Sequence, residues 1–167
     1  MDKSYKLSEY PNHVAFIMDG NRRWAKKHRQ PIIDGHKKGS EVIKKIIKTS
    51  LKLNIKYLTF FSFSTENWNR KPNEINQLKG LLNEYLESEI DSFISNKIKF
   101  NVIGNLSKFE INIQKKIKKL EDKTKNFKKL NFTLALSYGS RNEIVKAVEK
   151  IKSEKITKVN ERIFTNH

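Results

Sequence analysis

Short unbroken apolar runs alternate along the chain with longer segments in which apolar residues recur every three or four positions. Short runs rich in β-branched and aromatic residues, bounded by polar or glycine-containing turns, predict strands. The predicted strands are residues 14–18, 57–63, 100–103 and 132–136. The run at residues 14–18 contains no polar side chain, which is typical of a strand buried on both faces.

The longer segments have the period of amphipathic helices. We expect one helix from about residue 21, a second from after residue 39 to about residue 53, and a third from a cap on Asn73 to about residue 96. Two more should begin at a cap on Ser107 and at about residue 142. Glu110 follows Ser107 by three residues, which fits a capping box. The last of these helices should bury Ile144, Val145, Val148 and Ile151, and residues 159–167 have the pattern of the start of another helix.

Alternating strands and helices predict an α/β fold, an open and mostly parallel sheet flanked by helices, with right-handed crossovers. The chain shows no internal repeat, low-complexity linker or second apolar pattern that would mark another domain. We therefore expect residues 1–167 to form a single domain, a size sufficient for a real hydrophobic core.

Composition narrows the class of protein. The chain has no cysteine, which excludes disulfides and thiolate metal sites. The amino terminus lacks the apolar run of a signal peptide, and no apolar stretch approaches the roughly 20 residues that span a bilayer. These features predict a cytoplasmic protein.

The formal net charge of +17 raises the question of nucleic-acid binding. The basic residues are 29 lysines and only 6 arginines, spread along the whole chain. Surfaces that read nucleic acid more often gather arginines and aromatic side chains in one patch. We therefore expect no nucleic-acid partner, although a basic nucleic-acid-binding module remains the alternative from another functional class.

The stretch at residues 13–24 changes abruptly from apolar to chemically active side chains. Gly20 allows close approach of a ligand, and a helix beginning at Asn21 would point free amides outward towards an anion. Arg22 and Arg23 add positive charge for phosphate. The carboxylate of Asp19 would repel phosphate unless Mg²⁺ lies between them. A diphosphate–Mg²⁺ site fits these residues, and an ordinary Asp-Gly turn fits the stretch alone equally well.

Three polar loops follow predicted strands, at residues 19–24, 64–70 and 138–141. In a parallel sheet these loops share one edge, so they can converge on a single pocket. The usual nucleotide-binding glycine loops are absent from the sequence, as are the H-E-x-x-H zinc motif and the paired-carboxylate D-D-x-x-D motif. The expected pocket is therefore of another kind.

Five motifs in a fixed order identify that kind. They are H-V-A-F-I-M-D-G-N-R-R-W at residues 13–24, G-H-K-K-G at 35–39, F-S-T-E-N-W-N-R at 63–70, I-G-N-L-S-K-F at 103–109 and S-Y-G-S-R at 137–141. In order and spacing the chain resembles the cis-prenyltransferases, the family of undecaprenyl diphosphate synthase, also called isoprenyl transferase.

The resemblance implies an activity. The family condenses isopentenyl diphosphate with an allylic diphosphate such as farnesyl diphosphate, with Mg²⁺ as cofactor. The product is a long-chain cis-polyprenyl diphosphate, and for this chain we expect the undecaprenyl carrier lipid of cell-wall synthesis. The resemblance also implies a homodimer in the full-length form and contact with a membrane surface through the lipid product.

The resemblance assigns roles to individual residues. Asp19 matches the catalytic aspartate that binds Mg²⁺ and assists departure of the allylic diphosphate, and Asn67 matches the proposed proton acceptor. The remaining matches are substrate-binding positions: Gly20, Asn21, Arg22, Arg23, Trp24, His36, Ser64, Thr65, Glu66, Trp68 and Arg70. Four further residues match a product tunnel or its floor: Leu82, Tyr85, Leu86 and Phe132.

Simpler interpretations exist for several of these residues. Trp24 and Trp68 could be half-buried aromatics that only pack the loops. His36 could be a capping or solvent histidine. Tyr138 and Arg141 could hold the sheet edge to the helix that follows, and we assign them no substrate role.

The sequence departs from the family pattern in two places. Ile32 occupies a position where the family usually carries an arginine, so one phosphate contact is missing unless Arg29 or Lys37 replaces it. The later R-T-G-G-E-type motif and the closing W-P-D-F segment do not occur in residues 1–167. We therefore expect a fold that is incomplete at the carboxyl terminus and little condensation activity by this chain alone, as in a fragment or a partner-dependent subunit.

Overall fold

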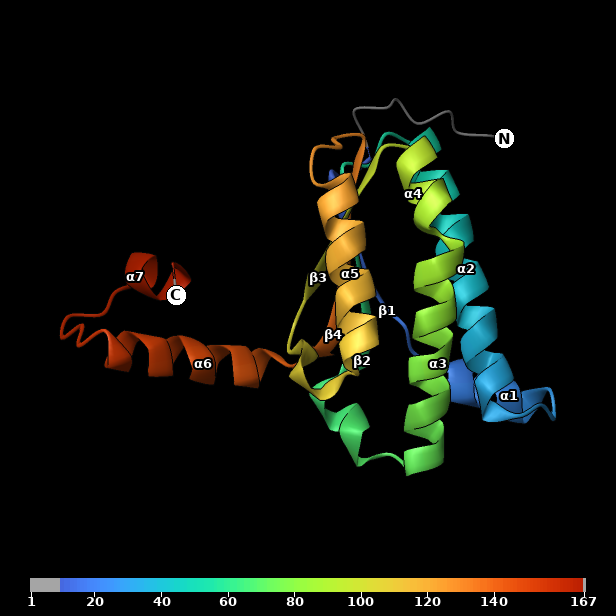
Figure 1. The fold of residues 1–167 in the computed structure, drawn as a ribbon, viewed down its shortest axis with the longest axis horizontal. Coiled ribbons are helices and arrows are strands. Elements are labelled where there is room, and N and C mark those ends of the chain that lie inside the picture. Colours follow the sequence, from blue (N-terminus) through green and yellow to red (C-terminus); the bar gives the residue numbers. More distant parts are fainter. Residues whose placement is uncertain (1–9, 167) are drawn as a thin grey trace.

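Four parallel strands form one sheet in the computed structural model, which describes residues 10–166 (Figure 1). Across the sheet they follow the order β1 (His13–Ile17), β2 (Tyr57–Ser64), β4 (Leu130–Tyr138) and β3 (Ile98–Ile103). All three pairings are parallel. The predicted α/β fold with a parallel sheet is confirmed, and the four strands lie where the apolar runs placed them.

Seven α-helices and two short 3-10 helices connect and follow the strands in the described part of the chain. They are α1 (Asn21–Lys27), α2 (Ile32–Lys52), η2 (Thr65–Asn69), α3 (Pro72–Ser88), α4 (Ile90–Ser95), η3 (Leu106–Lys108), α5 (Ile111–Thr124), α6 (Ser140–Ser153) and α7 (Glu161–Thr165). Of the helices described, none is long and apolar enough to cross a membrane.

The hydrophobic core lies between one face of the sheet and helices α2 to α5. On this face Phe60, Phe100 and Phe132 are fully buried, and Phe93 of α4 packs on them. The ring centroids of Phe93 and Phe132 are 5.2 Å apart and those of Phe60 and Phe132 are 5.4 Å apart. Offset and edge-on packing at these separations is favourable for aromatic rings. Phe132 is therefore a central core residue.

Strand β1 is not buried on both faces, contrary to the expectation from its apolar sequence. It lies at the edge of the sheet, and its residues alternate between exposed and half-buried. Ile17 is 80% exposed. The reason is that helices α2 to α5 cover only the face that carries Val14 and Phe16, which pack against the core.

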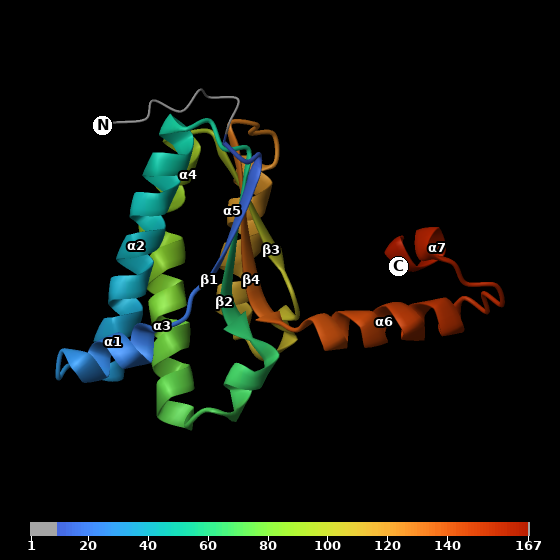
Figure 2. The ribbon, with the colours of Figure 1, turned by 180° about the vertical axis from the view of Figure 1, so that it is seen from behind.

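Helix α6 does not bury the apolar stripe that its sequence predicts. Ile144, Val145 and Val148 are each about half exposed, and only Ala147 and Ile151 are buried. The helix points away from the sheet in both views, so the stripe does not reach the core (Figures 1 and 2). The short helix α7 confirms the expected helix after residue 159 and contacts α6.

The predicted helix over residues 73–96 consists of two helices that meet at Glu89. Glu89 is buried, and its carboxylate lies 2.5 Å from Lys44 Nζ of α2. The first of the two begins at Pro72, because proline has no amide hydrogen to leave unpaired in a first turn. The N-cap is Lys71, so the predicted cap on Asn73 was wrong by two residues.

The predicted capping box between Ser107 and Glu110 is also absent. Asn105 instead accepts a hydrogen bond from Ser107 N at 3.0 Å and starts the 3-10 helix η3. Glu110 is itself the N-cap residue of α5. The chain thus makes two separate turns between β3 and α5 where the sequence suggested one.

Two glycines of α2 allow α1 to pack against it. Helix α2 begins at Ile32, so Gly35 and Gly39 lie inside the helix and not before it. A Cβ atom at Gly35 would lie 2.1 Å from Asn21 O, and one at Gly39 would lie 2.8 Å from Asn21 Oδ1. The G-H-K-K-G motif is therefore the surface on which the start of α1 rests.

We predict that Gly35→Ala lowers the free energy of unfolding by about 3 kcal/mol, because a Cβ there collides with the backbone of α1. The control is Gly80→Ala in α3, where a Cβ meets nothing within 4 Å. That change should raise the free energy of unfolding by about 0.5–1 kcal/mol, since alanine favours the helix. Urea denaturation of both variants measures the difference, and equal effects would contradict the proposed contact.

Candidate functional site

The carboxyl ends of the strands bring the predicted polar loops to one edge of the sheet. Asp19 follows β1 by two residues, η2 follows β2 directly, and Gly139 follows β4. The loops after β2 and β4 are in close contact, since a Cβ at Gly139 would lie 2.5 Å from Thr65 Oγ1. The parallel arrangement thus places these loops as the sequence predicted.

Asp19 lies in an exposed turn with both carboxylate oxygens hydrogen-bonded. Its Oδ1 accepts a bond from Gly20 N at 2.6 Å, and its Oδ2 accepts one from Arg23 Nη2 at 3.0 Å. These two bonds, with that from Arg23 the stronger influence, hold the pKa of Asp19 below its ordinary value. Gly20 makes the turn possible because its φ of 89° is unfavourable for other residues. Asp19 is therefore an ionised carboxylate beside an arginine.

His36 lies on α2 behind this turn and contacts Asn21. Asn21 Nδ2 lies 3.4 Å from His36 Nδ1, which makes Nδ1 the acceptor and leaves the proton on Nε2. His36 Nε2 is buried and has no hydrogen-bond partner among the described residues. Burial lowers the pKa of His36, and the positive charge of Arg70 lowers it further. A neutral imidazole with a free N–H is the result.

Glu74 joins two of the predicted arginines, and the sequence analysis did not single it out. Its Oε1 lies 2.9 Å from Arg70 Nη1 and 3.9 Å from Arg22 Nε. Its side chain is largely buried, in the first turn of α3. Glu74 thereby holds an arginine from α1 beside one from the loop after β2. Glu74 stands four residues after Arg70 at the start of a helix, and this spacing could have predicted the ion pair from the sequence.

The loop after β2 is ordered by its own side chains. Asn67 Oδ1 accepts a hydrogen bond from Ser64 N at 3.2 Å, and the Ser64 side chain bonds the Asn67 backbone in return. This capping box starts the 3-10 helix η2 and fixes the amide of Asn67. Glu66 in the same helix is exposed.

The two tryptophans differ in their surroundings. Trp68 Nε1 donates to Ser137 Oγ at 2.9 Å, and its ring packs edge-on against Phe63 and Phe109 at 4.9 and 5.2 Å. Trp68 therefore links the loop after β2 to the end of β4. Trp24 stacks on His28, the C-cap residue of α1, at 4.2 Å between ring centroids, which fits the packing interpretation.

Tyr138 fits the structural interpretation given to it from the sequence. Its hydroxyl donates to Glu143 Oε2 at 2.5 Å and so joins the end of β4 to α6. This bond raises the pKa of the Tyr138 hydroxyl.

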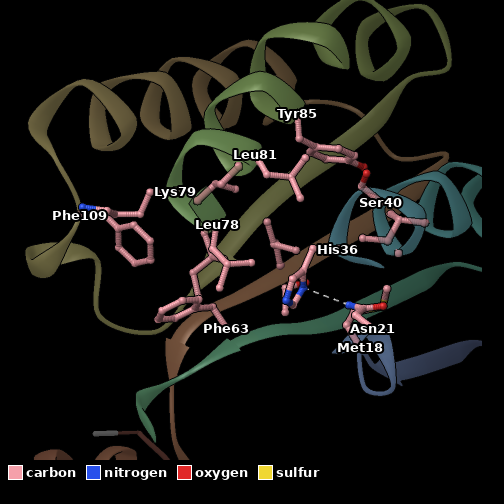
Figure 3. A pocket seen from close by; sticks show the side chains of 16 residues that line it. Met18, Asn21, His36, Ser40, Phe63, Leu78, Lys79, Leu81, Tyr85 and Phe109 are labelled. Carbon is pink, nitrogen blue, oxygen red and sulfur yellow. Dashed lines mark hydrogen bonds between the residues drawn. The ribbon is translucent and has the colours of Figure 1, made fainter. Parts of the chain in front are cut away.

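A mainly apolar pocket of about 100 Å³ opens beside these polar groups (Figure 3). Its walls come from α2, α3, β2, β4 and Phe109. Asn21 and His36 lie at one end of it, and Tyr85 lies further along α3. The hydroxyl of Tyr85 is buried without a hydrogen-bond partner among the described residues.

Of the four tunnel candidates, Leu82 and Tyr85 line this pocket. Leu86 and Phe132 are buried in the core and are not part of the pocket wall. Asn21 and His36 are the predicted substrate-binding residues that line this pocket. The others belong to the segments at the carboxyl ends of β1 and β2.

The edge offers few ligands for a metal ion. In residues 10–166 no three His, Cys, Asp or Glu side chains come together as a metal site. Asp19 supplies one exposed carboxylate, and Mg²⁺ is commonly bound by one or two carboxylates together with phosphate oxygens and water. The residues therefore fit a Mg²⁺ ion that arrives with a diphosphate, and they do not fit a metal held by protein alone.

These features define a parallel α/β protein with a phosphate-compatible edge next to an apolar pocket, the class that binds ligands at the carboxyl ends of its strands. A family model described as "Putative undecaprenyl diphosphate synthase" matches residues 17–167. Similar curated proteins are named isoprenyl transferase. That of Clostridium perfringens is 43% identical over 94% of this chain and 64% of its own length, and that of Aquifex pyrophilus is 40% identical over 93% and 68%.

Solved structures agree with these matches. Lavandulyl diphosphate synthase from Lavandula x intermedia, crystallised with dimethylallyl diphosphate, superposes with a TM-score of 0.88 at 33% identity, covering 94% of this chain and 70% of that one. A probable undecaprenyl diphosphate synthase from Campylobacter jejuni gives a TM-score of 0.76 at 33% identity, covering 95% and 69%. The chain therefore belongs to the isoprenyl transferase family of cis-prenyltransferases, and it spans about two thirds of the length of these relatives.

The lowered pKa of His36 predicts a pH dependence of stability. Because the folded state holds the imidazole less protonated than the unfolded state does, the free energy of unfolding should fall as the pH drops below about 6.5. His36→Asn should remove this part of the slope. Glu74→Gln should lower the pKa of His36 further, because the carboxylate favours the imidazolium. Urea denaturation across this pH range measures the slope, and NMR titration of the imidazole measures the pKa. An unshifted His36 would contradict the burial argument.

Proposed function

We propose that this edge binds the diphosphate of an allylic isoprenoid together with Mg²⁺, as the allylic half of a site that transfers the allylic group to isopentenyl diphosphate. The observation that carries the proposal is that the charged and polar side chains lie beside an apolar pocket suited to a hydrocarbon tail. These side chains are Asp19, Arg22, Arg70 and His36. A diphosphate with a hydrocarbon tail needs both surroundings at once. Membership of the isoprenyl transferase family supports the same reading.

Each group has a task in this proposal. Arg22, Arg23 and Arg70 bind phosphate oxygens, and the amides after Gly20 add neutral donors. Asp19 would hold the magnesium ion that arrives with the diphosphate, in place of its present bond with Arg23. When bound, Mg²⁺ neutralises charge on the diphosphate and so makes it a better leaving group. The pocket receives the hydrocarbon tail beneath these groups.

The transfer breaks the bond between the allylic carbon and its diphosphate oxygen. The π electrons of isopentenyl diphosphate form the new carbon–carbon bond, and a proton then leaves the condensed product. We propose Asn67 near this proton, with its amide fixed by the capping box with Ser64. An amide is barely basic, so its contribution is positioning, and the leaving diphosphate is the stronger base nearby.

The finer parts of the proposal are the product and the assembly. We propose a long-chain cis-polyprenyl diphosphate, in keeping with the undecaprenyl diphosphate synthase description of the matching family model. From the family resemblance we also propose that the product serves as the carrier lipid of cell-wall synthesis. We further propose that the full-length form is a homodimer that acts at the cytoplasmic membrane surface. Ile32 leaves the phosphates one arginine fewer, and Lys37 on the same helix is the candidate to replace it.

We predict that Asp19→Asn weakens Mg²⁺-dependent binding of farnesyl diphosphate by about tenfold to a hundredfold, as expected for loss of one charged ligand worth about 1.5–3 kcal/mol. Asp122→Asn is the matched control, since Asp122 is also exposed and also pairs with a basic side chain, Lys118, at 3.3 Å. Isothermal titration calorimetry with and without Mg²⁺ measures the affinities. Equal affinities for both variants would refute the proposed role of Asp19.

The same variants test the alternative that the protein is a nucleic-acid-binding module. A basic nucleic-acid-binding module would bind RNA or DNA with strong salt dependence, and Asp19→Asn would leave that binding intact. Tight nucleic-acid binding without measurable binding of farnesyl diphosphate would favour that alternative.

A further inference from the structure

Six exposed lysines lie at the amino-terminal edge of the sheet, opposite the edge that carries Asp19. They come from the last turn of α2 and from the turns that lead into β2, β3 and β4. We refer to them as the lysine rim: Lys52, Lys56, Lys97, Lys125, Lys128 and Lys129. The three turns lie together at the top of Figure 1, whereas η2 and α1 lie in its lower half.

Backbone hydrogen bonds join the turns of the rim into one surface. Lys129 N donates to Lys97 O at 3.3 Å, and Asn131 N donates to Lys56 O at 2.8 Å. The lysine side chains therefore project from neighbouring positions on one rim.

The lysines of the rim form no ion pair within residues 10–166, although lysines elsewhere on α2, α3 and α5 do. The cause is visible in the sequence, since residues 42–65, 92–109 and 123–142 contain no acidic residue. Acidic side chains return at the opposite edge, where one follows each strand: Asp19, Glu66, Glu110 and Glu143. The turns of the rim thus carry positive charge only, and the acidic residues that precede two of them, Asp91 and Asp122, belong to helices α4 and α5.

The chemistry of the rim favours a lipid surface over a nucleic acid. The rim contains no arginine, Phe127 between its lysines is half-buried, and the half-exposed ring of Tyr57 beside Lys56 packs against His13. Nucleic-acid surfaces rely on arginine forks and exposed aromatics. Clusters of lysines attract anionic headgroups without needing an oriented partner.

We propose that the lysine rim docks this protein on an anionic lipid bilayer. The pocket extends along α3 from Leu78 to Tyr85, about 10 Å at the usual helical rise, in the direction of the rim. The consequence for the product rests on the proposed function. A hydrocarbon tail that grows past Tyr85 would approach the membrane, while the diphosphate stays in water at the opposite edge of the sheet.

Vesicle co-sedimentation tests the docking surface. The protein is mixed with vesicles of phosphatidylcholine, with or without phosphatidylglycerol at about one lipid in three, a charge density at which lysine clusters bind. The triple variant Lys97→Gln, Lys128→Gln and Lys129→Gln should lose about a hundredfold in partitioning to the anionic vesicles, since each lysine near the surface is worth about fivefold. Its affinity for farnesyl diphosphate should be unchanged.

The control carries the same change of charge on the side of the molecule. Lys115→Gln and Lys119→Gln of α5 together with Lys146→Gln of α6 alter exposed lysines that form no ion pair in the described structure. This variant should lose less than about threefold, because Lys115 and Lys119 lie more than one helical turn from the rim and α6 begins at the opposite edge of the sheet. Equal losses in the two variants, no preference for anionic vesicles, or tighter binding of a single-stranded RNA to the rim would each overturn the proposal. Vesicle docking without farnesyl diphosphate binding would instead count against the proposed function alone.

Discussion

The contact between the start of α1 and the glycines of α2 positions the candidate site. Asn21 fits against Gly35 and Gly39 at distances that leave no room for a side chain. The same residue contacts His36 with its amide and directly follows the Asp19–Gly20 turn. Because one residue makes all these contacts, the position of the acidic turn relative to the histidine depends on backbone packing and not on the exposed charges.

Ion pairs determine how firmly each charged side chain of the site is held. Asp19 is exposed and held by Arg23, so it can change partners at small cost. Arg70 is held more firmly, because Glu74 is largely buried and bonds it at 2.9 Å. The edge therefore combines a carboxylate that is free to move onto a metal ion with an arginine in a fixed place. That division is suited to a charged ligand that arrives with its own cation.

The sequence was sufficient for the architecture, because parallel strands and their helices have distinct hydrophobic periods. The sequence was also sufficient to place the polar loops at one edge, since Asp19, Thr65 and Gly139 each follow a predicted strand. It failed where burial depends on neighbours. The apolar sequence of β1 could not reveal that the strand lies at an edge, nor could that of α6 reveal that Ile144 and Val148 face solvent.

The sequence also failed where side chains compete for the same backbone groups. Ser107 was the predicted cap, and the folded turn shows that Asn105 accepts the bond instead. Glu74 was overlooked because its role depends on Arg22, which is distant in the sequence and adjacent only after α1 has packed. Leu82 and Tyr85 were assigned to a tunnel only by the family resemblance, and both line the pocket.

The central claim is that one edge of the sheet binds an isoprenoid diphosphate. Amide chemical-shift mapping of the labelled chain during titration with farnesyl diphosphate and Mg²⁺ tests it most directly. We predict shifts confined to residues 19–24, to the neighbourhood of His36, to residues 64–70 and to the pocket wall along α3. Shifts centred on the lysines at the opposite edge, or spread evenly over the surface, would contradict the account.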